Sequence, residues 1–118
     1  MEWIFQNDLP IYSQLVEQIK LAIVSGAFKP GERMNSVRDM AMEAGVNPNT
    51  LQRALQELER QGLVYSQRTT GRFVTEDTQV IDACKRALAQ GQLAAFLAAM
   101  KQLGYERAEI LALLEEEA

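Results

Sequence analysis

The sequence predicts a mainly helical fold with one small β-hairpin, followed by a two-helix tail. Three observations support this prediction. Apolar residues recur at helical spacing over most of the chain, their period shortens to two between residues 63 and 75, and glycine or proline stands at most junctions. A chain of 118 residues is long enough for one compact domain with an appendage. We therefore divide it into a domain of residues 1–75 and a tail of residues 76–118.

Composition narrows the classes of function. The chain is 47% hydrophobic and 24% charged, as expected of a globular protein. It has no apolar run of membrane-span or signal-peptide length, so we expect no membrane association and a cytoplasmic location. Cys84 is the single cysteine and histidine is absent. This composition excludes an internal disulfide, a metal site of cysteine and histidine ligands, and a histidine that acts as a catalytic base. We therefore expect no metal, no cofactor and no catalytic residue, and an enzyme is the least favoured class.

The first predicted helix runs from about residue 10 to residue 25 and ends at Gly26. One side of it is apolar, which places it against a core: Ile11, Leu15, Ile19, Ala22 and Ile23. We expect its polar side, which includes Gln14 and Gln18, to face solvent. Residues 1–8 are too short for more than an edge strand or a lid over the core.

The second predicted helix runs from about residue 37 to residue 44, after a Pro30–Gly31 turn. Ser36 is a suitable N-cap, and Asp39 stands three residues on, as in a capping box. The residues expected in the core are Val37, Met40 and Ala41. Gly45–Val46 then gives the tight turn expected between the two helices of a helix-turn-helix.

The third predicted helix lies in the stretch 45–64 and occupies the recognition position of that motif. Asn47 is a good N-cap, Pro48 fits the first helical position, and Gly62 can end the helix. Its core side carries Leu51, Ala54, Leu55 and Leu58, and its opposite side carries Asn49, Gln52, Arg53, Gln56 and Arg60. No acid precedes Glu57, and a neutral, donor-rich helix N-terminus suits an incoming phosphate. The alternative is that this sequence is only a strong cap.

The charge distribution also favours a nucleic-acid partner. The first 75 residues carry eight basic and eight acidic side chains, and residues 76–118 carry four and eight, which together give the net charge of −4. Within residues 33–75, six arginines stand against four acidic residues: Arg33, Arg38, Arg53, Arg60, Arg68 and Arg72. Arginine suits fork-like recognition of phosphate or guanine, although arginines on a solvated face are the usual alternative.

A β-hairpin is predicted directly after the third helix. Alternation at Leu63, Tyr65 and Gln67, and again at Phe73 and Thr75, surrounds a turn that ends at Gly71. Arg68 and Arg72 flank the tip, where exposed arginines can reach the DNA backbone or a minor groove. The hairpin would then act as a wing.

Residues 10–75 resemble the winged helix-turn-helix domain of the GntR family of bacterial transcription regulators. The matching motifs are Pro10-Ile11-Tyr12, Pro30-Gly31, Ser36-Val37-Arg38, Gly45 to Thr50, and Arg68 to Val74. Asn35 and Thr69 depart from the family pattern, which usually has proline and often glycine at these positions. The resemblance implies double-stranded DNA as a partner, with contacts from Arg38, Asn47, Asn49, Thr50, Gln52, Arg53, Arg68 and Gly71. The alternatives are that Asn47 is only a cap, that Arg53 and Arg60 are solvated, and that Arg38 pairs with Glu43 or another acid.

The apolar pattern of the tail sequence predicts how the protein assembles. A long helix is expected from about 77 to 103, with Gly91 as a weak point and Gly104 as its end, and a shorter helix from about 106 to 116. Two helices cannot enclose a sizeable metabolite pocket, yet their apolar residues need covering. A second copy of the chain is the simplest cover, and the alternative is a tail that folds back on its own domain. The short tail resembles the YtrA-type branch of the family.

These observations together predict a sequence-specific transcriptional regulator. We expect a homodimeric repressor that binds an inverted-repeat operator, and the resemblance to the YtrA-type branch associates it with transporter operons. The alternative is a winged helix that serves protein contacts without sequence-specific DNA binding. The sequence identifies no effector, operator or regulated gene.

Overall fold

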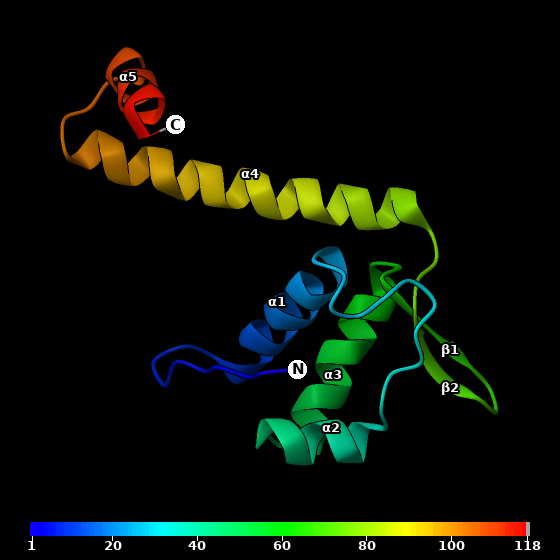
Figure 1. The fold of residues 1–118 in the computed structure, drawn as a ribbon. Helices are drawn as coiled ribbons and strands as arrows, with labels where there is room; N and C mark the ends of the chain where they lie inside the picture. Colours follow the sequence, from blue (N-terminus) through cyan, green and yellow to red (C-terminus); the bar gives the residue numbers. More distant parts are fainter. Residues whose placement is uncertain (118) are drawn as a thin grey trace. The chain divides into compact units, whose positions relative to one another are not determined.

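The computed structural model describes residues 1–117 and confirms the predicted fold class. The described residues form α1 (Ile11–Val24), α2 (Val37–Ala44), α3 (Pro48–Arg60), β1 (Val64–Gln67), β2 (Gly71–Val74), α4 (Thr78–Gln102) and α5 (Arg107–Glu117) (Figure 1). They group into two compact units, Met1–Lys85 and the chain from Arg86 onward. The first unit thus includes the beginning of α4. A functional division between residues 75 and 76 stays a prediction.

The core of the first unit lies between α3 and the two helices before it. α3 contacts α1, α2 and β1, and Figure 1 shows it crossing both helices. All four residues predicted for its inner side are at most 1% exposed, because their spacing places them on one stripe of the helix. The first turns of α4 cover this core with partly buried side chains: Val80, Ile81 and Cys84.

The helix boundaries follow the capping residues. Ser36 caps α2 by accepting a hydrogen bond from the Asp39 N–H at 3.1 Å, and Gly45 ends the helix in the left-handed region at a φ of 70°. Gly62 follows α3 at a φ of 80°, and the Leu63 N–H donates to the Leu58 carbonyl at 3.0 Å. The predicted bounds of both helices are therefore confirmed.

The predicted hairpin is present, and each of its two faces carries an apolar pair. β1 and β2 are antiparallel, with Val64 opposite Val74 and Tyr65 opposite Phe73. The two valines are buried, whereas the Tyr65 and Phe73 rings stack on the other face with centroids 5.6 Å apart. Both faces therefore carry apolar pairs, so alternation alone does not identify the inner one.

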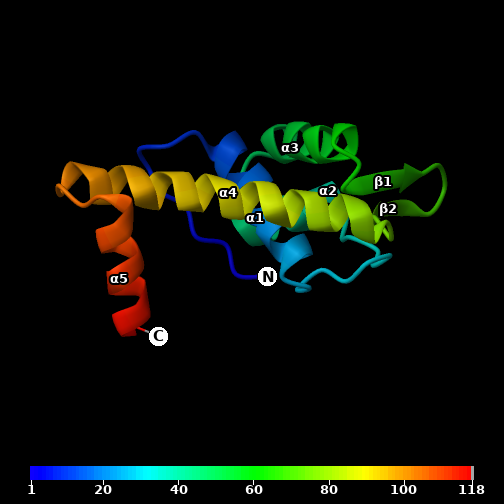
Figure 2. The ribbon, with the colours of Figure 1, turned by 90° about the horizontal axis from the view of Figure 1, so that it is seen from above.

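A third extended segment, residues 32–34, runs beside β2 of this two-stranded sheet. The Val74 N–H donates to the Glu32 carbonyl and the Met34 N–H to the Arg72 carbonyl, both at 2.9 Å. Arg33 forms an isolated bridge with Phe73. The hairpin is therefore held along one edge by the segment that leads into α2, and Figure 2 shows it projecting past the end of α3.

The N-terminal segment forms the predicted lid, and two α1 glutamines hold it. The Gln18 side chain accepts from the Ile4 N–H at 3.2 Å and donates to the Ile4 carbonyl at 2.6 Å. Gln14 makes the same pair of bonds with Gln6, at 2.7 and 2.9 Å. These side-chain amides pair with the backbone of the N-terminal segment as a neighbouring strand would. This corrects the expectation that the two glutamines only face solvent. The Trp3 ring stacks on Phe5, and both pack against the core.

The tail contains the two predicted helices. α4 continues through Gly91 without a break and ends before Gly104, whose φ is 91°. In the second unit, α5 runs across the C-terminal end of α4 and buries Ile110 (Figures 1 and 2). Ala118, the last residue of the predicted tail, lies outside the described residues. No helix within residues 1–117 is both long and apolar enough to span a membrane.

Candidate DNA-binding surface

The N-terminus of α3 is exposed and free of acidic residues. The Asn47 side chain accepts a hydrogen bond from the Asn49 N–H at 2.7 Å, so the cap predicted at Asn47 is formed. Pro48 and Asn49 are exposed, and Thr50 and Gln52 are half-buried. The first turn carries no acid to compete with an incoming anion. The Asn47 oxygen itself is used by the cap.

The two arginines on the outer side of α3 differ in how they are bound. The Arg53 guanidinium lies 4.8 Å above the centre of the Tyr12 ring, and among the described residues it forms no ion pair. Arg60 instead donates from Nε to Glu57 Oε1 at 2.9 Å. That hydrogen bond, followed by one from Gln61, lowers the pKa of Glu57 to about 2. Arg60 is therefore neutralised locally, whereas the charge of Arg53 stays available.

Arg72 is not the exposed arginine that the sequence predicted. Its Nε donates to Glu59 Oε1 at 2.7 Å, and its side chain is only 17% exposed. The Ser66 hydroxyl donates to the same carboxylate oxygen. Burial raises the pKa of Glu59, but the hydrogen bonds from Ser66 and Arg72 outweigh this effect and hold the pKa below its usual value. These contacts join both strands of the wing to α3.

The remaining predicted site residues lie at the wing tip and on α2. Arg68 and Gly71 are exposed, and Gly71 adopts a φ of 114°, which a residue with a Cβ rarely does. Arg38 is exposed on the first turn of α2. The alternative partner Glu43 lies instead 3.6 Å from the N-terminal ammonium group. Arg33, one of the six arginines counted above but not one of the predicted contacts, has its guanidinium beside Gly71.

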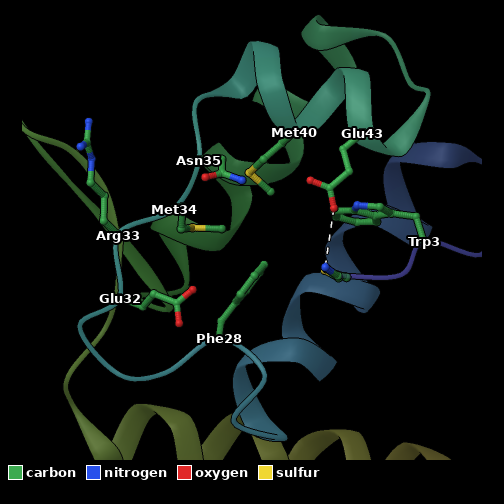
Figure 3. Close-up of a pocket in the computed structure, with 9 residues that line it drawn as sticks. Trp3, Phe28, Glu32, Arg33, Met34, Asn35, Met40 and Glu43 are labelled. Atoms are coloured by element: carbon green, nitrogen blue, oxygen red, sulfur yellow. Dashed lines mark ion pairs between the residues drawn. The ribbon is translucent and has the colours of Figure 1, made fainter.

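A small cavity lies beside the segment that carries Arg33. It has a volume of about 70 Å³ and lies between the N-terminal segment and α2 (Figure 3). Trp3, Phe28, Met34, Met40 and Glu43 are among the residues that line it. This volume is far below the several hundred cubic ångströms typical of a metabolite pocket.

A helix-turn-helix followed by a hairpin, with an acid-free recognition-helix N-terminus and free arginines beside it, defines a winged helix-turn-helix domain of the DNA-binding type. The sequence profile described as "Bacterial regulatory proteins, gntR family" matches residues 11–74. The chain belongs to the GntR family of transcriptional regulators. Because this family and the relatives below are transcriptional regulators, the expectation that the protein is not an enzyme is confirmed.

Two relatives from Bacillus subtilis (strain 168) match most of the chain. The uncharacterized HTH-type transcriptional regulator YhcF is 40% identical over 107 residues, which cover 91% of this chain and 88% of YhcF. The HTH-type transcriptional repressor YtrA is 34% identical over 98 residues, covering 83% of this chain and 71% of YtrA. Both matches extend beyond the winged helix into the tail, and the predicted resemblance to the YtrA-type branch is confirmed.

Solved structures agree with this assignment. A GntR family transcriptional regulator from Listeria monocytogenes superposes with a TM-score of 0.88 at 36% identity, covering 95% of this chain and 98% of that protein. The DNA-binding domain of AraR in complex with operator ORX1 superposes with a TM-score of 0.57 at 31% identity, covering 64% of this chain and 96% of that domain. The second match is to a structure that contains DNA.

Proposed function

We propose that the protein is a homodimeric transcriptional repressor that binds an inverted-repeat operator. The observation that carries the proposal is the exposed, acid-free N-terminus of α3, capped by Asn47 and followed by a wing that is fixed to the same helix. The AraR domain, which has the same architecture, is bound to operator DNA in its structure. α3 is the element that would enter the major groove.

The site residues divide by chemistry. Asn49 and Gln52 carry amides that can pair with adenine in two-pronged fashion, and Arg53 can do the same with guanine while Tyr12 holds it. Arg38 and Arg68 are exposed cations suited to phosphates. The remaining predicted site residues lie at the α3 N-terminus and in the wing. Asn47 caps the helix, Thr50 offers a hydroxyl donor, and Gly71 lies at the wing turn. Arg72 fixes the wing to α3 through its hydrogen bond to Glu59.

The tail supports the dimer because its apolar side chains remain uncovered within the second unit. An open groove of about 430 Å³ lies between α4 and α5, and exposed apolar side chains line it. These include Leu93, Phe96, Leu97, Leu111 and Leu114, which are 39–56% exposed. Contiguous apolar surface of this kind marks an interaction site, and a two-fold partner is the usual occupant.

Symmetry then specifies the operator. A two-fold dimer presents two copies of α3, so the half-sites should be inverted and their centres about 10 bp, or a multiple of that, apart. Following the resemblance to the YtrA-type branch, we extend the proposal to the control of a transporter operon.

Sedimentation and DNA binding test the proposal together. Full-length protein should sediment as a dimer at micromolar concentration and should bind one intergenic fragment next to its own gene in preference to a scrambled duplex. Inserting 5 bp, about half a helical turn, between the half-sites should abolish that preference because it turns the second half-site to the other side of the DNA. A monomer without preference for any fragment would favour a winged helix used for protein contacts.

A further inference from the structure

We propose that the groove between the segment leading into α2 and the wing binds a DNA phosphate, and that Arg33 is its principal cation. The inference rests on the proposed DNA-binding function and assigns a contact beyond the predicted set. The wing groove, as we call it, has one wall formed by residues 33–37 and the other by residues 66–72, with a volume of about 430 Å³.

The chemistry of the wing groove suits an anion. None of the described residues that line it is acidic. Its lining combines arginines with small polar side chains, and those outside the two wing strands are Arg33, Asn35, Ser36, Arg68, Thr69 and Thr70. Arg72 also lines it, but Glu59 neutralises that guanidinium. Within residues 1–117, neither Arg33 nor Arg68 forms an ion pair. Two unneutralised charges thus face a space that holds no carboxylate.

The fold directs Arg33 into this groove. The neighbouring side chain, Met34, is 7% exposed and belongs to the core, so Arg33 extends from the opposite side of the same segment. Arg33 also lines the small cavity, and Figure 3 shows its side chain extending from there along the side where the hairpin runs. Its backbone bridge to Phe73 fixes the position of its Cα against the wing.

Gly71 provides the space that the guanidinium occupies. A Cβ added at Gly71 would lie 3.2 Å from Arg33 Nε and 3.6 Å from one of its terminal nitrogens. The absence of a side chain at Gly71 therefore leaves room for the planar guanidinium against the wing backbone. Arg33 is exposed and, within residues 1–117, forms no ion pair, so its full charge remains for a phosphate.

A salt titration of full-length protein tests the inference. The slope of log Kobs against log salt concentration reports the number of phosphates neutralised, at about 0.9 per contact in B-DNA. Arg33→Gln should reduce this slope by about 0.9 for each protomer bound and should weaken operator and scrambled duplexes alike. Arg33→Lys should keep the slope, because it keeps the charge. Lys85→Gln removes an exposed cation on α4 that does not line the groove, and it should leave the slope unchanged.

The outcomes separate this inference from the function on which it rests. If wild type shows no preference for operator over scrambled DNA, the proposed function fails. If wild type shows that preference but Arg33→Gln gives the wild-type slope, the phosphate site in the wing groove is refuted and the function stands. Thermal melting of each variant checks the fold. A second outcome would also refute the site. In it, Arg33→Gln melts at a lower temperature than wild type, and Arg33→Lys restores the melting temperature but not the salt slope.

Discussion

The contact between Glu59 and the wing yields a prediction with a defined magnitude. Glu59 accepts hydrogen bonds from Ser66 on β1 and from Arg72 on β2, and its side chain is 29% exposed. Removing the carboxylate by Glu59→Ala leaves the half-buried Arg72 guanidinium without its acid. Hydrogen bonds to charged groups contribute about 1.5–3 kcal/mol, and partial solvent access reduces this. We therefore expect a loss of about 1–2 kcal/mol in the free energy of unfolding.

Urea denaturation at fixed protein concentration measures this loss, and hydrogen exchange of the β1 and β2 amides locates it. Glu57→Ala is the matched control, because it removes an acid from the same helix whose partner, Arg60, lies at the surface. The pKa of Glu59 is lowered by folding, so its contribution is complete above the usual carboxyl value of 4.5 and is lost as pH falls through the lower folded value. The difference between wild type and Glu59→Ala should therefore shrink below pH 4.5. Equal losses for both variants, with unchanged exchange in the wing, would refute the argument.

Three further predictions concern the cap, the recognition helix and the tail. Asn47→Ala should lower the free energy of unfolding by about 1 kcal/mol while Asn47→Ser should not, as urea denaturation can check; equal stability of all three proteins would contradict the cap. Tyr12→Leu should weaken operator binding by about 0.5–1 kcal/mol, whereas Tyr12→Phe, which keeps the ring, should not. A titration in which both variants bind alike would contradict the cation–π contact. Leu97→Glu should give monomers in sedimentation, and a dimer that persists would show that the tail groove is not the interface.

Sequence reasoning succeeded wherever the signal is local. Asn47, Pro48 and Gly62 fix the two ends of α3 through backbone chemistry that involves only their immediate neighbours. Helical spacing then identified the buried stripe of α3, since one helix face must pack against the other helices. The acid-free first turn could be recognised in the same way.

The sequence did not reveal features that depend on long-range pairing. Arg72 contacts Glu59 thirteen residues away because the hairpin register places it on the inner face beside Ser66. Arg33 reaches the wing only through the third extended segment, which is too short to be recognised from alternation. Gln14 and Gln18 resembled an ordinary solvated helix face, because nothing local indicates that a distant segment will pair with their amides.

One binding measurement tests the central claim most directly. Wild type, Gln52→Ala and Arg68→Ala are titrated with an inverted-repeat duplex from the protein's own locus and with a scrambled duplex, over a range of salt concentrations. Wild type should prefer the inverted repeat. Gln52→Ala should lose about 1–3 kcal/mol per contact and relax the preference at one base position, whereas Arg68→Ala should weaken both duplexes alike and lower the salt slope. Equal binding of wild type to both duplexes, with both variants indistinguishable from it, would contradict sequence-specific DNA recognition by this surface.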